Sequence, residues 1–244
     1  MNRPGIVGHR GAGNLAPENT LAAVYTAIRM GLTAIECDVQ ATADGELVLF
    51  HDTSIERTTD GSGLLADTAL DDLKLLDAGV WFDYLYRGEH VATFQDALEL
   101  IDGRLTVFVE LKQPSTVDRT ADIVERCRGE SWCRIISYSE YVLAQSARRL
   151  PQVPRTFLIN PESAPDPLEV IEHLNAIPAD MVGVPLRWLE TDLVAKIRQA
   201  GFQVITGPVD TVGHCQQITE AQPDFLLTNE PGNVISYFDD QDSA

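Results

Sequence analysis

Short apolar runs alternate with longer amphipathic segments along the whole chain, and this alternation constrains the fold more than any other feature of the sequence. A short apolar run bounded by turn residues is typical of a buried strand, whereas apolar residues at helical spacing predict a helix that packs on one face. Strands that alternate with such helices favour a parallel sheet covered by helices. The expected strands span residues 6–7, 34–39, 47–50, 106–111, 134–137, 156–159, 181–184, 203–206 and 225–228.

The number of strand–helix units decides between a doubly wound sheet and a barrel. About eight units in about 250 residues is the size of a TIM-type barrel, and this chain has 244 residues. We therefore predict an α/β fold, a TIM-type (β/α)8 barrel that forms a single domain over residues 1–244. The expected helices span residues 20–30, 94–101, 117–128, 140–150, 168–175, 192–200 and 212–221.

Two segments depart from the simple repeat. Asp44 and Gly45 lie between two apolar runs, and this pair is typical of a hairpin turn in place of a helix. Residues 52–92 then form a small insertion after the second strand, too long for a simple connection. Two roles remain open for the aromatic residues of this insertion: they form a lid that shapes the leaving-group side of the barrel mouth, or they fill a small core of their own. These residues are Trp81, Phe82, Tyr84 and Tyr86.

The charge of the chain limits its partners. There are 37 acidic and 18 basic residues, which gives a formal net charge of −19. Because such a protein repels nucleic-acid backbones and anionic membranes, we expect no nucleic-acid partner and no stable membrane association. No apolar run reaches the length of about 18 residues that a membrane span needs. The four cysteines lack the spacing of a disulfide framework or zinc site, and no signal peptide is recognisable, so we expect a cytoplasmic protein.

Carboxylates occur on strands that are otherwise apolar. Glu36 and Asp38 share one face of their expected strand, because side chains alternate along a strand, and Cys37 points the other way. Glu110 lies near the end of the strand at 106–111, where alternation places it beside Lys112. Buried carboxylates are costly unless a cation neutralises them, and oxygen ligands suit Mg²⁺ or Ca²⁺. We therefore expect Glu36, Asp38 and Glu110 to bind one divalent cation.

Histidines and basic residues occur at the same strand ends. His9 and Arg10 follow the first expected strand, and His51 follows the run at 47–50. The carboxyl ends of barrel strands meet at one mouth, where barrel enzymes react. There, Arg10 and Lys112 can contact a phosphate group, and the two histidines can act as general acid and general base. This set of residue types predicts phosphodiester hydrolysis.

A structural interpretation remains open for each residue. Glu36 with Arg10, or Glu110 with Lys112, can form a buried ion pair without any catalytic role. The convergence of several polar features at the ends of the first strands favours a functional site instead. For His90, His173 and His214 we predict structural roles only.

The chain resembles the glycerophosphodiester phosphodiesterase family, and most densely so up to Lys112. The resemblance implies a TIM-type barrel, a divalent metal, and hydrolysis of glycerophosphodiesters to sn-glycerol 3-phosphate and an alcohol. It further implies His9 and His51 as the acid–base pair, a metal site, and phosphate contacts from Arg10 and Lys112. Its motifs are His9-Arg10-Gly11, Pro17-Glu18-Asn19-Thr20, Glu36-Cys37-Asp38-Val39, His51-Asp52 and Glu110-Leu111-Lys112, and the insertion matches at residues 55–61 and 76–79.

The C-terminal half departs from the family pattern. The strand end at residues 204–210 lacks the tryptophan that the family usually has there, and Asn229 stands where an aspartate is common. Two alternatives to the glycerophosphodiesterase are a lysophospholipase D-type enzyme on the same barrel and a catalytically silent binding module for phosphorylated metabolites. The strongly negative charge argues against the first, and the complete set of histidines and carboxylates argues against the second.

Overall fold

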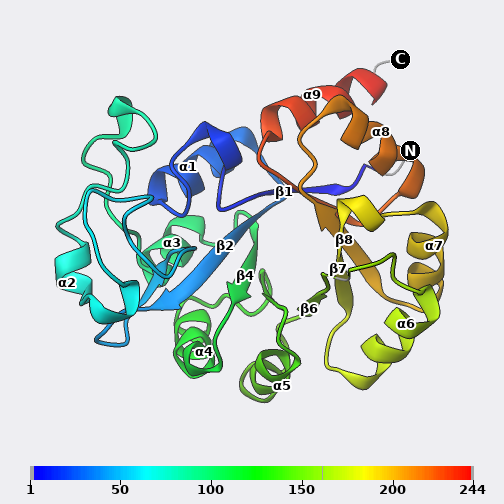
Figure 1. Cartoon of the computed structure of the whole chain (residues 1–244), viewed down its shortest axis with the longest axis horizontal. Coiled ribbons are helices and arrows are strands. Elements are labelled where there is room, and N and C mark those ends of the chain that lie inside the picture. Colours follow the sequence, from blue (N-terminus) through cyan, green and yellow to red (C-terminus); the bar gives the residue numbers. More distant parts are fainter. Residues whose placement is uncertain (1–2, 161, 243–244) are drawn as a thin grey trace.

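A closed barrel of parallel strands forms the centre of the molecule. The computed structural model describes residues 3–160 and 162–242. Neighbouring strands pair in the order β1-β9-β8-β7-β6-β5-β4-β2, and pairing of β1 with β2 closes the ring (Figure 1). The prediction of a (β/α)8 barrel is therefore confirmed. The barrel strands are β1 (Gly5–Gly8), β2 (Ala34–Ala41), β4 (Thr106–Leu111), β5 (Cys133–Ser137), β6 (Arg155–Leu158), β7 (Met181–Pro185), β8 (Gln203–Gly207) and β9 (Phe225–Thr228).

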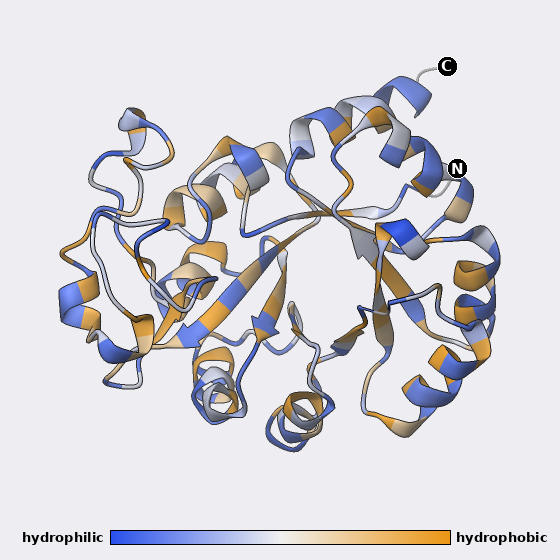
Figure 2. Ribbon diagram, viewed as in Figure 1, coloured by the Kyte–Doolittle hydropathy of each residue, from blue (hydrophilic) through white to orange (hydrophobic). Residues whose placement is uncertain are grey.

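Helices cover the outside of the barrel and turn their apolar residues toward it (Figure 2). Thr20, Thr93 and Ser139 each cap a helix by accepting a hydrogen bond from a backbone N–H in its first turn. One long helix, α9, is missing from the sequence prediction; it contributes Val234 and Phe238 to the core. The α-helices are α1 (Leu21–Met30), α2 (Leu70–Leu73), α3 (Phe94–Ile101), α4 (Val117–Arg126), α5 (Glu140–Arg149), α6 (Pro167–Ala176), α7 (Thr191–Gln199), α8 (Val212–Ala221) and α9 (Pro231–Asp242).

The predicted hairpin follows β2. Strand β3 (Leu47–Leu49) pairs antiparallel with β2, and the connecting turn contains Gly45 with a φ of 81°. A positive φ is easily adopted by glycine, which explains the Asp-Gly pair at this turn. The hairpin directs the chain away from the barrel and into the insertion that follows His51.

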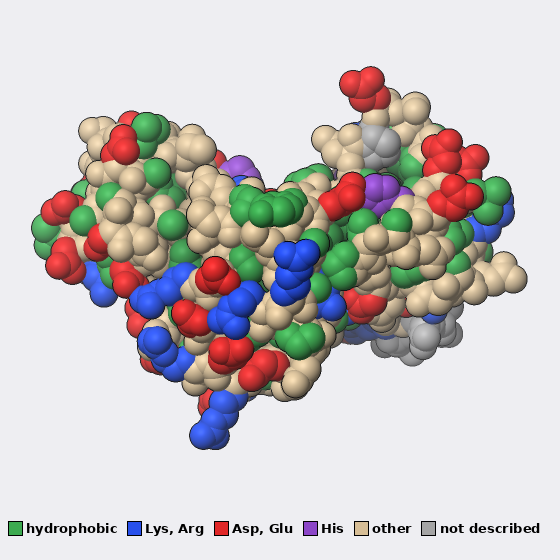
Figure 3. Space-filling model, turned by 90° about the horizontal axis from the view of Figure 1, so that it is seen from below, with side chains coloured by type: hydrophobic (Ala, Val, Ile, Leu, Met, Phe, Trp, Pro, Cys, Tyr) green, Lys and Arg blue, Asp and Glu red, His purple; other side chains and the backbone are tan. Residues whose placement is uncertain are grey.

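The insertion packs around a small core of its own and forms a separate lobe at one side of the molecule (Figure 3). Phe82 contacts Trp81 and Tyr86 edge to face, and Tyr86 donates a hydrogen bond to the carbonyl of Leu15. None of the described residues of segment 52–92 lines the cavity at the barrel mouth. The small core contains none of the four aromatic residues: Trp81 and Tyr84 are partly exposed, and Tyr86 packs against the barrel core. Both interpretations of these residues, as a lid and as a local core, stay predictions.

The barrel interior holds a layer of apolar side chains, with the buried Arg134 at the start of β5 and polar side chains at the carboxyl ends of the strands. Val7, Ala34 and Phe108 pack inside the barrel, while Ile35 and Cys37 face the surrounding helices. This alternation continues along β2 and β4, so the side chains of Glu36, Asp38 and Glu110 face inward near the carboxyl ends.

Acidic and basic side chains are mixed on the face that Figure 3 shows. The net charge of −19 is therefore not concentrated in one patch on this face. Among the described residues, the helices are too short or too polar to cross a lipid bilayer.

Candidate active site

The barrel mouth contains a cavity of about 390 Å³. That volume lies within the range of small-molecule sites, about 300–1,000 Å³. Its polar side is formed by side chains from the ends of β1 and β4, from β2 and from the hairpin. These side chains are His9, Arg10, Glu36, Asp38, His51 and Glu110.

A tight turn after β1 places His9 and Arg10 against β2. Arg10 has a φ of 52° and Gly11 a φ of 105°. A Cβ at Gly11 would lie 2.7 Å from the Cβ of Ala23, so only glycine fits here. In this turn the backbone N–H of Arg10 donates to Oε2 of Glu36 at 2.9 Å, which joins the turn to the carboxylate cluster.

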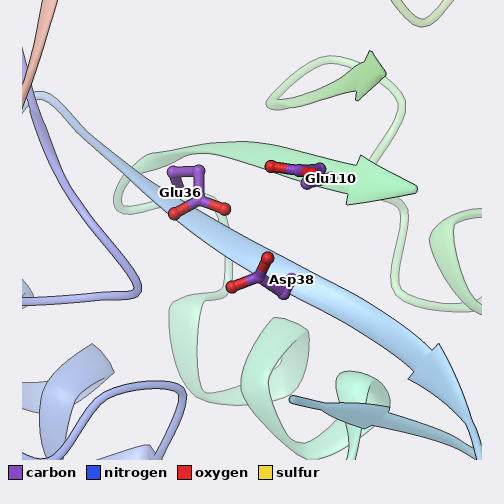
Figure 4. A group of neighbouring side chains, drawn as sticks. All are labelled: Glu36, Asp38 and Glu110. Carbon is purple, nitrogen blue, oxygen red and sulfur yellow. The ribbon is translucent and has the colours of Figure 1, made fainter. Parts of the chain in front are cut away.

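Three carboxylates form the centre of the site. Glu36 and Asp38 project from β2 and Glu110 from the neighbouring strand β4 (Figure 4), and the strand register places Asp38 beside Glu110. One oxygen from each of the three lies within 4.8 Å of the others. Glu36 and Asp38 are almost completely buried, and Oε1 of Glu36 has no hydrogen-bond partner among the described residues. A buried oxygen without a partner, in a cluster of oxygen donors, fits a hard divalent cation.

The carboxylates repel one another where no cation separates them. Burial, together with the charges of Asp38 and Glu110, raises the pKa of Glu36 well above its usual value. Burial and the charge of Asp38 raise the pKa of Glu110 to about 7. Raised carboxyl pKa values are the expected cost of bringing like charges together in a partly dehydrated site.

Asp38 differs from the other two because cations and an amide contact it. Nζ of Lys112 lies 2.7 Å from Oδ1, and Nδ2 of Asn19 donates to Oδ2 at 3.0 Å. Although burial opposes ionisation, the ammonium group of Lys112 holds the pKa of Asp38 below its usual value. Lys112 thus pairs with Asp38 and also donates to the carbonyl of His51. The sequence prediction had placed Lys112 beside Glu110.

The two histidines have different partners. Nδ1 of His9 lies 2.7 Å from Oδ1 of Asn229, a neutral amide. Nδ1 of His51 lies 2.6 Å from Oδ1 of Asp52, a carboxylate. Burial lowers the pKa of His9, although the hydrogen bond with Asn229 opposes this effect. Nε2 of His9 lies 3.8 Å from Oε2 of Glu36.

A further ion-pair network supports this side of the site. Arg57, from the insertion, donates to Asp52 at 2.5 Å and to both oxygens of Glu18 at 2.8 Å. Glu18 also accepts a hydrogen bond from Arg10 at 2.6 Å. The network ties the insertion to the two residues that flank the carboxylate cluster, Arg10 and His51.

The structure brings all seven residues singled out in the sequence to one mouth, with Lys112 just outside the cavity lining. The sequence predicted no role for the neighbouring residues that hold these seven side chains in place. Glu18, Asn19 and Asp52 belong to the motifs that the chain shares with the family, but only the folded chain shows what they contact. The supporting residues are Glu18, Asn19, Asp52, Arg57, Asp210 and Asn229.

The rest of the cavity lining is mainly apolar. Its wall includes Phe108, Ile136 and Leu158, together with two glycines, Gly183 and Gly207. Gly207 lies in the strand end that lacks the tryptophan usual in the family, and a Cβ at this position would lie 2.7 Å from the Cβ of Leu227. Four polar side chains, Tyr138, Asn160, Arg187 and Thr206, complete this part of the lining, and Arg187 donates to Asn160 at 2.6 Å.

The closed barrel and the histidine–carboxylate cluster at its mouth are those of a barrel enzyme that hydrolyses phosphodiesters. Residues 9–233 match the model of the glycerophosphoryl diester phosphodiesterase family, and the chain belongs to that family. A glycerophosphodiester phosphodiesterase of Caldanaerobacter subterraneus is 28% identical over 246 residues, which cover 95% of this chain and 96% of the relative.

Solved structures agree with this membership. An Oleispira antarctica phosphodiesterase in complex with the product sn-glycerol-3-phosphate is 27% identical, with a TM-score of 0.84 and 97% of each chain covered. A glycerophosphodiester phosphodiesterase from Agrobacterium tumefaciens is 28% identical, with a TM-score of 0.83, and the match covers 96% of this chain and all of the other.

Proposed function

We propose that this enzyme hydrolyses glycerophosphodiesters to sn-glycerol 3-phosphate and an alcohol, with a divalent cation and two histidines. The observation that carries the proposal is the buried carboxylate cluster, with an unpartnered oxygen on Glu36, in a cavity that both His9 and His51 also line. The family and the product bound to the Oleispira relative support the substrate class.

Glu36, Asp38 and Glu110 would hold the cation. Three carboxylates supply oxygen ligands alone, which favours Mg²⁺ or Ca²⁺ over Zn²⁺. When bound, such a cation polarises the phosphoryl oxygens and makes the phosphorus easier to attack.

Arg10 would contact the remaining phosphate oxygens, and Lys112 would act on the phosphate through its charge. Arg10 lines the cavity and lies beside Asp38, with Nε 3.6 Å from Oδ2. The Nε atom of Arg10 is buried and has no hydrogen-bond partner within the described part of the chain, so the ion pair with Asp38 is its nearest charged contact. Lys112 stays paired with Asp38 and would contribute through its charge, since it lies outside the cavity lining.

We assign His9 as general base and His51 as general acid. A general base must be neutral before the reaction, and burial next to a neutral amide favours the neutral ring of His9. In this role Nε2 of His9 removes the proton from the attacking hydroxyl, which belongs to water or to the glycerol 2-position. His51 then donates a proton from Nε2 to the leaving alcohol, while Asp52 holds its Nδ1.

We further propose that the chain acts as one domain and that its partner is a small-molecule glycerophosphodiester. The insertion is joined to the barrel by the ion pairs of Arg57 and by Tyr86, so it is expected to unfold together with the barrel. The four free cysteines agree with the expected cytoplasmic location.

The apolar side of the cavity favours one second candidate, a lysophospholipase D-type activity. Phe108, Ile136 and Leu158 offer a surface that a small polar head group does not need. Against this candidate stands the net charge of −19, which repels anionic lipid surfaces.

The test is a substrate panel with the metal-stripped and re-metallated enzyme. We expect glycerol 3-phosphate from glycerophosphodiesters with Mg²⁺ or Ca²⁺ and no product in excess chelator. Lysophosphatidylcholine, presented below its critical micelle concentration, serves as the second arm. Turnover of the lysolipid alone would favour the second candidate, and full activity in chelator would refute metal dependence.

A further inference from the structure

A chain of hydrogen bonds connects His9 to a carboxylate outside the cavity lining. Nδ1 of His9 lies 2.7 Å from Oδ1 of Asn229, and Nδ2 of Asn229 donates to Oδ2 of Asp210 at 2.9 Å. His9 follows β1, Asn229 follows β9 and Asp210 lies in the connection after β8, so three neighbouring strand ends contribute one residue each. Asp210 and Asn229 are absent from the residues that line the cavity.

The carboxylate determines the direction of both hydrogen bonds. A carboxylate only accepts, so the amide nitrogen of Asn229 must face Asp210, and the amide oxygen must face His9. That oxygen is also only an acceptor, so Nδ1 of His9 carries a proton and donates it. In the neutral ring, Nε2 therefore has a free lone pair, and this is the atom on the Glu36 side of the ring.

Asp210 is held in turn by further donors. Its Oδ1 accepts from the backbone N–H of Asn229 at 2.7 Å and from the hydroxyl of Thr228 at 3.2 Å. Together with the side chain of Asn229, three N–H or O–H groups donate to this one carboxylate. A neutral amide at position 210 would present an NH₂ group to at least one of these donors, so it cannot replace the carboxylate without loss.

We propose that Asp210 is a positioning residue that acts through Asn229 to fix the orientation and tautomer of His9. It touches neither the cavity nor the carboxylate cluster, and its effect on the reaction passes through the ring of His9. The inference rests on the proposed function, in which Nε2 of His9 is the base. A ring whose tautomer is not fixed spends part of its time with Nε2 protonated and unable to accept a proton.

The experiment compares two single substitutions, at positions 210 and 229, with the double variant that combines them. Asp210→Asn removes the acceptor that orients Asn229, and we expect kcat to fall by at least about tenfold with little change in KM. Asn229→Asp places two carboxylates in contact and should also lower kcat. When both exchanges are combined, the new amide at position 210 donates to the new carboxylate at position 229, and that carboxylate still accepts from His9. The double exchange should therefore recover most of the loss in kcat.

A spectroscopic measurement separates positioning from general stability. The ¹⁵N shifts of the His9 ring should report a single tautomer with the proton on Nδ1 in the wild type and a mixture in Asp210→Asn. Asp224→Asn is the matched control. Asp224 precedes the first residue of β9, away from the mouth, and its carboxylate accepts a hydrogen bond from the backbone N–H of Val204. It should lower the Tm without changing the tautomer or kcat.

Two outcomes would overturn the inference: an unchanged His9 tautomer in Asp210→Asn, or a double exchange that is no more active than the single variants. The tautomer measurement needs no substrate. It therefore still tests the positioning role if the wild-type enzyme hydrolyses no glycerophosphodiester, which would refute the proposed function instead.

Discussion

His51 and Asp52 are consecutive in the chain, and Nδ1 of His51 lies 2.6 Å from Oδ1 of Asp52. A donor–acceptor pair of this kind turns Nε2 of the ring toward the cavity, which His51 lines. Because Arg57 donates to the other oxygen of Asp52 at 2.5 Å, the insertion takes part in holding the ring.

The first prediction concerns the role of His51 as general acid. His51→Ala should slow hydrolysis of substrates with a poor alcohol leaving group by about 10²–10⁴-fold. A nitrophenyl ester, whose leaving group needs no proton, should lose far less. The measurement is kcat/KM on both substrates, with His90→Ala, an exposed histidine of the insertion, as the control. Equal losses on both substrates would exclude His51 from this role.

The second prediction concerns metal binding. A cation that binds only the folded protein raises its stability, by about 2.7 kcal/mol at a concentration of 100 times the Kd. For a chain of this length, Mg²⁺ or Ca²⁺ should then raise the Tm of the chelated enzyme by about 5–10 °C. Glu36→Gln should abolish the shift, whereas Glu46→Gln, which removes a half-exposed partner of Arg119, should retain it. An unchanged shift in Glu36→Gln would remove Glu36 from the ligands.

The third prediction is a pH dependence of stability from the Arg57 network. Hydrogen bonds from Arg57 lower the pKa of Asp52, and they lower that of Glu18 although burial opposes the shift. In the unfolded chain these two carboxyl groups have pKa values of about 4. At a pH near 4, the folded state therefore binds fewer protons than the unfolded state. The stability from these pairs is present at neutral pH and is lost as the pH falls through the folded pKa values.

Arg57→Met should accordingly lower the Tm at pH 7 and approach the wild-type value in acid. The control is Arg149→Met, because the partners of Arg149 on α4, Asp118 and Asp122, are 84% and 52% exposed. Such exposed pairs contribute little at any pH. A constant difference between Arg57→Met and the wild type across the acid range would contradict the assignment.

The fourth prediction concerns the aromatic residues of the insertion. Trp81→Ala and Tyr86→Ala should lower the Tm, because Trp81 packs against Phe82 and Tyr86 ties the insertion to Leu15. The ranking of choline, ethanolamine and glycerol head groups should not change, since neither residue lines the cavity. A changed ranking at unchanged metal affinity would support the lid interpretation instead of the local core.

The fifth prediction concerns the head group. Arg187 places a positive charge on the side of the cavity opposite the strand that bears Glu36 and Asp38. A cationic choline should therefore be bound less well there than a neutral glycerol head group. Arg187→Gln should raise the relative kcat/KM on glycerophosphocholine by up to about fivefold. A fall in that ratio would show that Arg187 does not repel the head group.

Much of the fold could be predicted because its signal is local. Most barrel strands are buried and apolar over successive residues, and all the expected strands are present within one or two residues of their predicted ends. That Glu36 and Asp38 share one face of β2 follows from strand alternation alone. Helix α9 escaped prediction because its sequence has no clear apolar periodicity, and Val234 and Phe238 become core residues only against the barrel.

The partners of the site residues depend on contacts between distant parts of the chain. The sequence by itself determined a barrel with carboxylates, histidines and cations at its mouth, because strand alternation and strand ends are local features. Only the tertiary structure decided that Lys112 pairs with Asp38 and that Asn229 meets His9 across 220 positions of sequence. The physical reason is that the register of β2 and β4, and the closure of β1 against β9, depend on packing of the whole barrel.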